Sequence, residues 1–501
     1  MNRFIAICSL LVLIACDKVS AFELESNEER FDRQAAMLKI IDSRTQVSDF
    51  TLHTDFFSVS FTSGEVFKFS LEGTPVFNIA ENGEWFVNGT KTDVKAQFEG
   101  ALAAIPEIRI SETGKWIIGG EETAIMAHTE LTAEDLEMSY ISHIVYANDW
   151  LHVFLFNGEP LRVPVVSDPF YQVPSYFQDI LVKKELKAEE FIQNSDGDFD
   201  AFIFFTDAHW GYNYKHSPAL IRHITEYTSI KKTFFGGDVI TNYFGNLVAP
   251  MQLGQEFQSS FSFLGPHFYC VYGNHDNNSA GQPSKNDRHL SEGQVASWLQ
   301  SQMTVLDKKE GYNFYFDNIS SRTRYIGLDT GRYHNASFRS TSPETAQFLI
   351  SALSSVPDDW HIIVISHIWA NYKVVDNIET SVFVPYYNSF LNIITNYNER
   401  KNGEYTYKDQ TVAYDFTMSR ATVECCIGGH THLNSVLSYK EKLPVIIVGK
   451  DSMKRDFHKD HEGTYKEQCV AILIMDYKHR EIKLLFVGYG EDQTIVIPYS
   501  A

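Results

Sequence analysis

The chain changes from apolar to polar within one short stretch, Ala201-Phe-Ile-Phe-Phe-Thr206-Asp207-Ala-His209. A short apolar run predicts a buried strand, and the carboxylate and imidazole that follow lie where that strand ends. Because residues i and i+2 of an extended strand share a face, we expect Asp207 and His209 to reach one ion together. The stretch therefore predicts a strand that leads into a metal site.

The same change recurs farther along the chain. Buried strands are predicted at residues 233–235, 267–272, 325–328, 360–365 and 421–427, with helical or loop segments between them. This alternation is typical of an α/β layered fold. Further polar clusters follow these strands, and they are Gly236-Gly237-Asp238, Gly273-Asn274-His275-Asp276, Ser366-His367 and Gly428-Gly429-His430-Thr-His432. Since ligand sites of open α/β folds lie outside the carboxyl ends of strands, we expect the clusters to converge.

The residue types in these clusters suit metal binding. Carboxylate and amide oxygens together with imidazoles, and without thiolates, form sites for Zn, Fe, Mn or related ions. Glycines before Asp238, Asn274 and His430 allow the close backbone approach that a tight cluster needs. In a loop, His430 and His432 can diverge towards two ions.

In chain order these motifs are Asp-x-His, Gly-Asp, Gly-Asn-His-Asp, His and Gly-His-x-His. In them the sequence resembles the calcineurin-like metallophosphoesterase family, over residues 200–440. The resemblance implies a domain at 180–501 of the α/β class, a two-sheet β-sandwich flanked by helices. A strand-rich C-terminal stretch, residues 470–497, is expected to complete one sheet.

The resemblance also implies a role for each residue. It assigns to one metal ion Asp207, His209 and His432, and to the second Asn274, His367 and His430, with Asp238 bridging both. His275 is the implied general acid, and Asp276 is expected to orient it. The implied cofactors are two divalent or trivalent ions, Mn, Fe, Zn or Ni.

The implied reaction is hydrolysis of a small phosphomonoester or phosphodiester by a metal-bridging hydroxide. Nucleotide-type pyrophosphates rank behind these substrates. The sequence departs from the family pattern at Ile368-Trp369, where a small residue and a proline are frequent, and we expect a reshaped pocket wall there. The insertions 280–303 and 369–415 border the predicted site and are candidates for substrate selection.

Other side chains near the motifs have weaker signals. Arg332 and His334 follow the strand predicted at 325–328 and are candidates for substrate contact. Trp210 and Tyr212 come directly after the first motif, where they either line the pocket or pack in the core.

The N-terminal part has a different pattern. Residues 75–89 and 106–120 repeat each other, each with an alternating strand, a Glu-Asn-Gly or Glu-Thr-Gly turn and a second strand that begins on Trp85 or Trp116. This predicts repeated β-hairpins within a small β-rich domain at 22–170. The tryptophans pack between repeats or, alternatively, stack on sugar rings. The repeat resembles Gly-Trp hairpin units of Gram-negative envelope proteins. Prolines 169 and 174 place a linker near 168–180.

Residues 1–15 resemble a secretion signal, a lone Arg3 followed by a short apolar run. Leu13-Ile14-Ala15-Cys16 resembles a lipobox, which would make Cys16 the acylated N-terminus; cleavage after Val19-Ser20-Ala21 is the alternative. We therefore expect secretion across the inner membrane and a lipid-anchored protein of a Gram-negative cell envelope. A surface binding or adhesion lipoprotein is the rival function, and a metal-dependent hydrolase of another bond is a second rival.

The net charge of −22 argues against general binding of nucleic acid or of an anionic membrane. Any phosphate chemistry then requires local cations. Four cysteines, Cys270, Cys425, Cys426 and Cys469, lie in apolar runs and are predicted to be buried thiols. The sequence does not define an oligomeric state.

Overall fold

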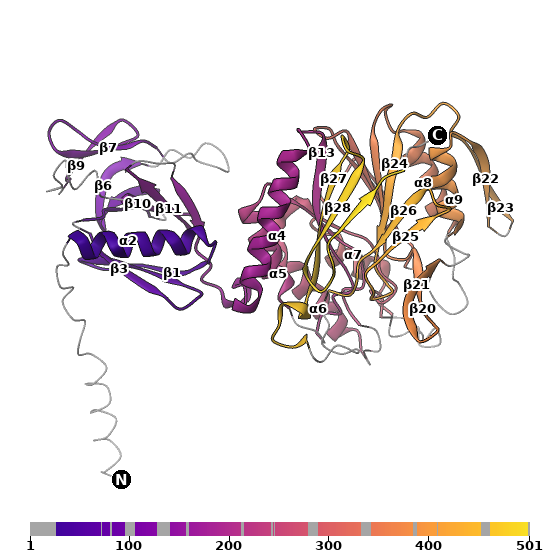
Figure 1. Cartoon of the computed structure of the whole chain (residues 1–501), viewed down its shortest axis with the longest axis horizontal. Coiled ribbons are helices and arrows are strands. Elements are labelled where there is room, and N and C mark those ends of the chain that lie inside the picture. The colour runs from indigo at the N-terminus through magenta and orange to yellow at the C-terminus, as the bar shows by residue number, and fades with distance from the viewer. Residues whose placement is uncertain are drawn as a thin grey trace, which may run out of the picture. The chain divides into compact units, whose positions relative to one another are not determined.

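The chain divides into an N-terminal unit, Met1–Gln172, and a C-terminal unit, Val173–Ala501 (Figure 1). The computed structural model describes residues 27–71, 73–80, 83–95, 106–127, 141–156, 160–211, 215–241, 244, 246–278, 289–331, 342–383, 388–407, 409–451 and 461–498. The predicted signal segment 1–15 and Cys16 lie outside these residues, as do Tyr212, Arg332 and His334. The boundary between the units falls inside the predicted linker. The second half of that linker is helical. Pro174 directly precedes this helix and therefore removes none of its backbone hydrogen bonds.

The described residues of the N-terminal unit form an α-helix and three sheets. The helix is α2 (Asn27–Asp42). The first sheet contains β1 (Val47–Leu52), β2 (Phe56–Phe61) and β3 (Val66–Ser70), and the third contains β7 (Ile108–Ile110), β8 (Lys115–Ile118) and β9 (Glu121–Met126). The second and largest has the strand order β12 (Leu161–Pro164), β11 (Trp150–Leu155), β10 (Ile141–Ala147), β4 (Val76–Ile79), β5 (Glu84–Val87) and β6 (Thr90–Lys95). A short 3-10 helix, Pro169–Tyr171, follows. The predicted β-rich character is confirmed, whereas the sequence analysis missed α2, which buries Met37 and Ile41 in the core of this unit.

Each sequence repeat folds as the predicted hairpin with a third strand added. The first repeat forms β4, β5 and β6, and the second forms β7, β8 and β9. Trp85 and Trp116 are only 2% and 7% exposed and share one apolar cluster with Phe77. The ring of Trp116 meets that of Phe77 edge-on, with centroids 5.0 Å apart. The tryptophans therefore pack between the repeats, and they are not exposed for stacking on sugars.

The C-terminal unit is built on two sheets. One has the strand order β15 (Phe268–Cys270), β14 (Lys232–Phe235), β13 (Phe199–Phe205), β27 (Cys469–Asp476), β28 (Glu481–Gly488) and β29 (Gln493–Val496). The other has the order β16 (Lys308–Glu310), β17 (Asn313–Asn318), β18 (Thr323–Leu328), β19 (His361–Ser366), β24 (Thr422–Gly428), β26 (Leu443–Ile447) and β25 (Ser435–Tyr439). All six strands predicted between residues 201 and 427 are present, and the C-terminal strands complete the first sheet as predicted.

Aromatic side chains pack where the two sheets face each other. The ring of Tyr325 on β18 stacks on Phe234 of β14 at 4.9 Å, and Phe316 on β17 stacks on Tyr269 of β15 at 4.1 Å. Helices flank both sides of this sandwich (Figure 1). They are α4 (Ser175–Asn194), α5 (Ser217–Tyr227), α6 (Val248–Ser260), α7 (Glu292–Leu299), α8 (Pro343–Ser354) and α9 (Asn388–Asn398), with 3-10 turns at Ser262–His267 and Tyr465–Glu467. The predicted flanked two-sheet sandwich is confirmed.

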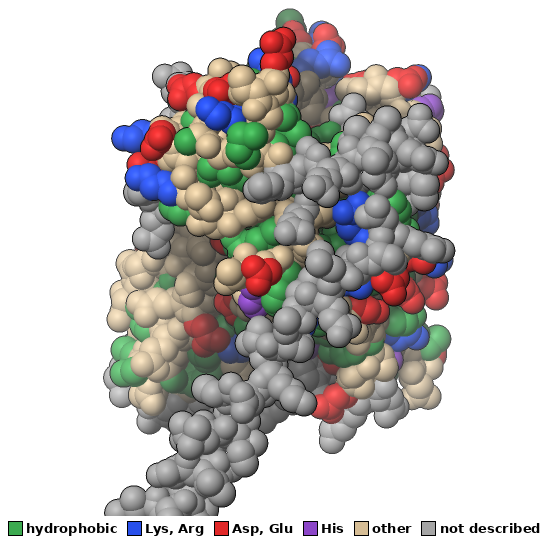
Figure 2. Space-filling view, turned by 90° about the vertical axis from the view of Figure 1, so that its left-hand side faces the viewer, with side chains coloured by type: hydrophobic (Ala, Val, Ile, Leu, Met, Phe, Trp, Pro, Cys, Tyr) green, Lys and Arg blue, Asp and Glu red, His purple; other side chains and the backbone are tan. Residues whose placement is uncertain are grey.

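The insertion 369–415 contains two hairpins besides α9. They are formed by β20 (Ala370–Val375) with β21 (Ile378–Phe383), and by β22 (Asn402–Tyr407) with β23 (Gln410–Asp415). The four cysteines named above are buried and free, as predicted. Among the described residues, no helix combines the length and apolar character required to cross a bilayer. On the face in Figure 2, the described acidic and basic side chains lie close to one another and form no continuous basic surface.

Candidate metal centre

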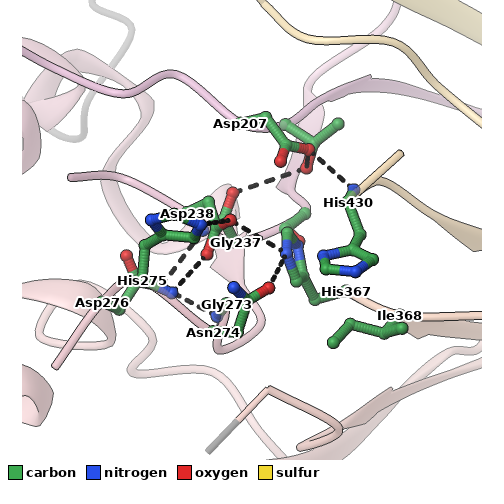
Figure 3. A network of polar contacts seen from close by, with 12 residues as sticks. Asp207, Gly237, Asp238, Gly273, Asn274, His275, Asp276, His367, Ile368 and His430 are labelled. Atoms are coloured by element: carbon green, nitrogen blue, oxygen red, sulfur yellow. Dashed lines mark hydrogen bonds and ion pairs between the residues drawn. The ribbon is translucent and has the colours of Figure 1, made fainter. Parts of the chain in front are cut away.

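The five predicted polar clusters meet at one end of the sandwich, in the loops that follow β13, β14, β15, β19 and β24 (Figure 3). The ligands do not sit on extended strands. β13 ends at Phe205, and both Asp207 and His209 have a positive φ, 54° and 43°. The expectation that alternation along a strand brings these two side chains together is therefore wrong. A left-handed turn of the backbone at each residue does so instead.

The first group of donors comprises Asp207, His209 and His432, whose ligand atoms all lie within 4.8 Å of one another. The Nε2 atoms of the two histidines are 3.2 Å apart, and His432 Nε2 is 3.3 Å from Asp207 Oδ1. Oδ2 of Asp207 accepts hydrogen bonds from Thr206 Oγ1 and from the backbone N–H of His430, at 2.8 and 2.9 Å. Oδ1 is buried without a hydrogen bond. An oxygen in this state is suited to a cation.

The second group comprises Asp238, His367 and His430, again within 4.8 Å. His367 Nε2 lies 3.1 Å from Asp238 Oδ2 and 3.1 Å from Asn274 Oδ1. The other ring nitrogen of His367, Nδ1, is 2.7 Å from the carbonyl oxygen of Gly236 and donates to it. That bond leaves the lone pair on Nε2, which is directed at the cluster.

The electrostatics of the cluster also fit bound cations. Burial, helped by His432, lowers the pKa of His209 to about 3 and so keeps this imidazole neutral, as a ligand must be. Burial opposes charge on His367 too, but Asp238 and Asp207 raise its pKa to about 9. Burial likewise opposes the charge of the two carboxylates, yet the facing His367 holds their pKa values below the usual range. The site thus attracts positive charge, which a metal ion supplies in place of a proton.

Asp276 has a different role from the one expected. Its carboxylate accepts the backbone N–H groups of Gly273, Asp238 and Val239, at 2.8, 3.2 and 2.7 Å. It therefore holds the loop after β15 against the loop that carries the bridging candidate Asp238. The expectation was that it orients the ring of His275. Burial and the neighbouring Asp238 raise the pKa of Asp276 to about 7.

His275 lies beside both groups and belongs to neither. Its backbone N–H donates to Asp238 Oδ1 at 2.8 Å, and its Nε2 is 3.7 Å from Asp238 Oδ2. The ring of His275 meets that of His209 edge-on at 5.2 Å. Its side chain is 24% exposed, whereas that of His367 is fully buried. This position beside the donors, open to solvent, is suited to a group that contacts a substrate.

Two supporting residues were missed by the sequence analysis. Asn278 is buried and its amide bonds both the N–H and the carbonyl of Phe244, at 3.1 and 3.2 Å, which holds the loop after Asp238. Asp451 is buried behind the first group, where its N–H donates to the Thr206 carbonyl and its carboxylate accepts from Ser217 Oγ at 2.7 Å. Asn278 is the second residue after the Gly-Asn-His-Asp motif, and this position was the available signal. Asp451 had none.

The sequence allows Trp210 either to line the pocket or to pack in the core, and the structure favours the core. The side chain is 1% exposed, and its ring meets Phe257 of α6 edge-on at 5.3 Å. Trp210 therefore packs in the core.

Comparison with known proteins agrees with this geometry. Residues 201–434 match the family model of the calcineurin-like phosphoesterases. The matched stretch lies within the C-terminal unit, which is therefore similar to the calcineurin-like phosphoesterases. No curated protein matches the chain.

Solved structures with some similarity include two phosphatases. A dimetal phosphatase from Danio rerio is 14% identical, with a TM-score of 0.40, and the match covers 60% of this chain and 99% of that one. A purple acid phosphatase from yellow lupin (Lupinus luteus) seeds is 12% identical, with a TM-score of 0.38 and coverage of 91% and 74%. Scores this low do not by themselves define an activity.

Proposed function

We propose that the C-terminal unit hydrolyses small phosphate esters with two metal ions. The observation that carries this proposal is the pair of donor groups, each with three ligand atoms within 4.8 Å. In the proposal Asp207, His209 and His432 hold one ion, Asn274, His367 and His430 hold the other, and Asp238 reaches both. Mn, Fe, Zn and Ni all suit such mixed oxygen and nitrogen ligands.

Bound cations would supply an activated water and neutralise the charge of the phosphoryl group. The protein's own residues supply the other functions of the site. The loops place the donors, and the fully buried Asp238 and His367 keep water away from the far side of the site. His275 donates a proton to the leaving oxygen, since its ring stands beside Asp238 and is partly open to solvent. The negative net charge of −22 makes the cations necessary for attracting an anionic substrate.

A direct test uses the purified protein with mono- and bis-p-nitrophenyl phosphate and each of the four metals. Asp238→Asn should lose both bound metal and activity. His275→Ala should keep the metal and lose about 10²-fold to 10⁴-fold in kcat, the usual contribution of a general acid. His267→Ala, at an exposed histidine away from the cluster, is the control and should leave kcat unchanged.

Wild-type protein that binds metal yet hydrolyses neither ester would contradict the proposal, as would full activity in His275→Ala. The ratio of the two wild-type rates separates a monoesterase from a diesterase, which we rank equally. Nucleotide-type pyrophosphates come next and are assayed in the same series.

A further inference from the structure

The β20–β21 hairpin is fixed to the metal centre at its base. It starts three residues after His367, and the indole Nε1 of the fully buried Trp369 donates to the carbonyl of Ile427 on β24 at 2.9 Å. On the returning strand, Ser381 Oγ is 2.9 Å from the hydroxyl of Thr431, and both residues are at most 3% exposed. Thr431 stands between the ligands His430 and His432. The base of the hairpin is therefore part of the site.

One face of the hairpin turns towards the ligand loop. Directly paired residues of antiparallel strands have their side chains on the same face, and Tyr372 pairs with Ser381 while Val374 pairs with Glu379. Because Ser381 contacts Thr431, Tyr372 lies on the hairpin face that is turned towards the loop carrying His430 and His432, about 5 Å from Ser381 along the pairing direction. Tyr372 OH also donates to Glu379 Oε1 at 2.9 Å, in agreement with both side chains lying on this face.

The far half of this face is exposed and mostly apolar. Tyr372 is 45% exposed and Val374 is 51% exposed. Exposed apolar side chains gathered at one place mark a binding surface more often than isolated ones do. The hairpin projects from the body of the C-terminal unit in Figure 1, where it is labelled β20 and β21.

We infer that Tyr372 and Val374 form a shelf that binds the organic part of the substrate, and that this part is apolar, planar and uncharged. A ring on the shelf can stack on Tyr372 while the phosphoryl group lies at the metal centre. Glu379 on the same face and Asp376 at the turn disfavour an anionic substituent, which argues against nucleotide pyrophosphates. This inference rests on the proposed phosphoesterase activity and narrows its substrate class.

The test compares 1-naphthyl phosphate with glycerol 2-phosphate, or the methyl diesters of both if wild-type protein hydrolyses only diesters. Tyr372→Ala should lower kcat/KM for the naphthyl ester about fivefold to tenfold and leave the glycerol ester within twofold. Tyr372→Phe keeps the ring and should behave like the wild type on both substrates. Metal content is measured for each variant and should not change.

Val375→Ala is the matched control. Val375 is 41% exposed on the same strand, but it pairs with Ile378 and so belongs to the opposite face. It should change neither substrate. Three results would contradict the inference that Tyr372 and Val374 bind the substrate. They are an equal loss of kcat/KM on both esters in Tyr372→Ala, no loss on either ester, and the same selective loss in Val375→Ala. Wild-type protein inactive on both esters would instead defeat the proposed function, so the two failures are distinct.

Discussion

Five of the seven proposed metal ligands have a positive φ angle, namely Asp207, His209, Asp238, His430 and His432. Such a backbone costs of the order of 1 kcal/mol or more at each non-glycine residue and persists only where the surroundings hold it. Here neighbouring loops do so. The N–H of Asp207 donates to Gly237, and that of His209 donates to Asp238, at 2.9 and 3.1 Å. The ligand backbone is thus fixed by the protein itself.

The hydrogen bonds that hold these loops together depend strongly on Asp276, so a single substitution there should weaken them. Asp276→Asn leaves one oxygen for three backbone donors and directs an amide N–H₂ towards at least one of them. We expect a loss of about 1 to 3 kcal/mol in unfolding free energy, together with weaker metal binding. Urea unfolding and metal titration measure the two effects.

Asp179→Asn, at an exposed position on α4, is the control for the loss of one charge and should be close to neutral. Unchanged metal affinity and stability in Asp276→Asn would show that the carboxylate does not hold the loops.

At this scale the sequence predicted which residues meet but not how they meet. Motif residues up to 225 positions apart, from Asp207 to His432, do converge. The left-handed turns at Asp207 and His209 could not be foreseen, since glycine is the strong sequence signal for such a backbone and most Asp and His residues have a negative φ. The role of Asp276 also depends on loop positions that a sequence does not specify.

Among the secondary structure elements, the β20–β21 hairpin matters most for the metal centre. Ser381→Ala removes the hydroxyl bonded to Thr431, which stands between two ligands. We expect metal to dissociate several-fold faster, because the ligand loop loses a buried contact, and we expect Ser381→Thr to restore binding. Competition with a chromogenic chelator gives the rates.

Thr380→Ala is the matched control, since Thr380 lies one residue away on the opposite face of the hairpin. If Thr380→Ala loosened the metal as much as Ser381→Ala, the effect would come from the hairpin as a whole and not from the Thr431 contact.

The elements that the sequence predicted are those with long apolar runs, such as β13, β19 and β24, because burial on both faces leaves a strong signal. The hairpins of the insertion 369–415 were missed for the opposite reason. β20 and β22 are largely exposed and mix polar with apolar residues, so neither has a clean alternation. Helix α2 has a weak apolar stripe and was missed similarly.

On the scale of the whole molecule, the two units have separate apolar cores. A ligand that binds only one folded unit stabilises that unit alone. We therefore predict that removing metal with a chelator lowers the melting temperature of the C-terminal unit and leaves the N-terminal unit unchanged. Calorimetry with hydrogen exchange of segments from both units tests this, and an equal shift in both would contradict it.

The N-terminal unit should in turn respond to acid. Burial lowers the pKa of His143 on β10 from 6.5 to about 4. The unfolded chain therefore takes up the proton first as pH falls, so stability is complete above pH 6.5 and is lost between about 6.5 and 4. The slope for this one group is at most about 1.4 kcal/mol per pH unit.

His143→Phe retains a ring beside Phe154, on which His143 stacks at 4.4 Å, and should flatten this dependence. Hydrogen exchange of β10 and β11 at several pH values measures it, with β13 and β27 in the same sample as the internal control. An unchanged slope in the variant would mean that other groups cause the acid sensitivity.

The partner of β13 has a consequence for the order of folding. β13 carries the loop with Asp207, and one of its two neighbours is β27, which pairs Phe202 with Leu473 across about 270 residues of intervening chain. That edge of β13 stays unsatisfied until nearly the whole C-terminal unit has been synthesised. Contacts so distant in sequence form slowly and late. We therefore expect the first metal site to be assembled last, so that a nascent or truncated chain acquires no activity before it is complete.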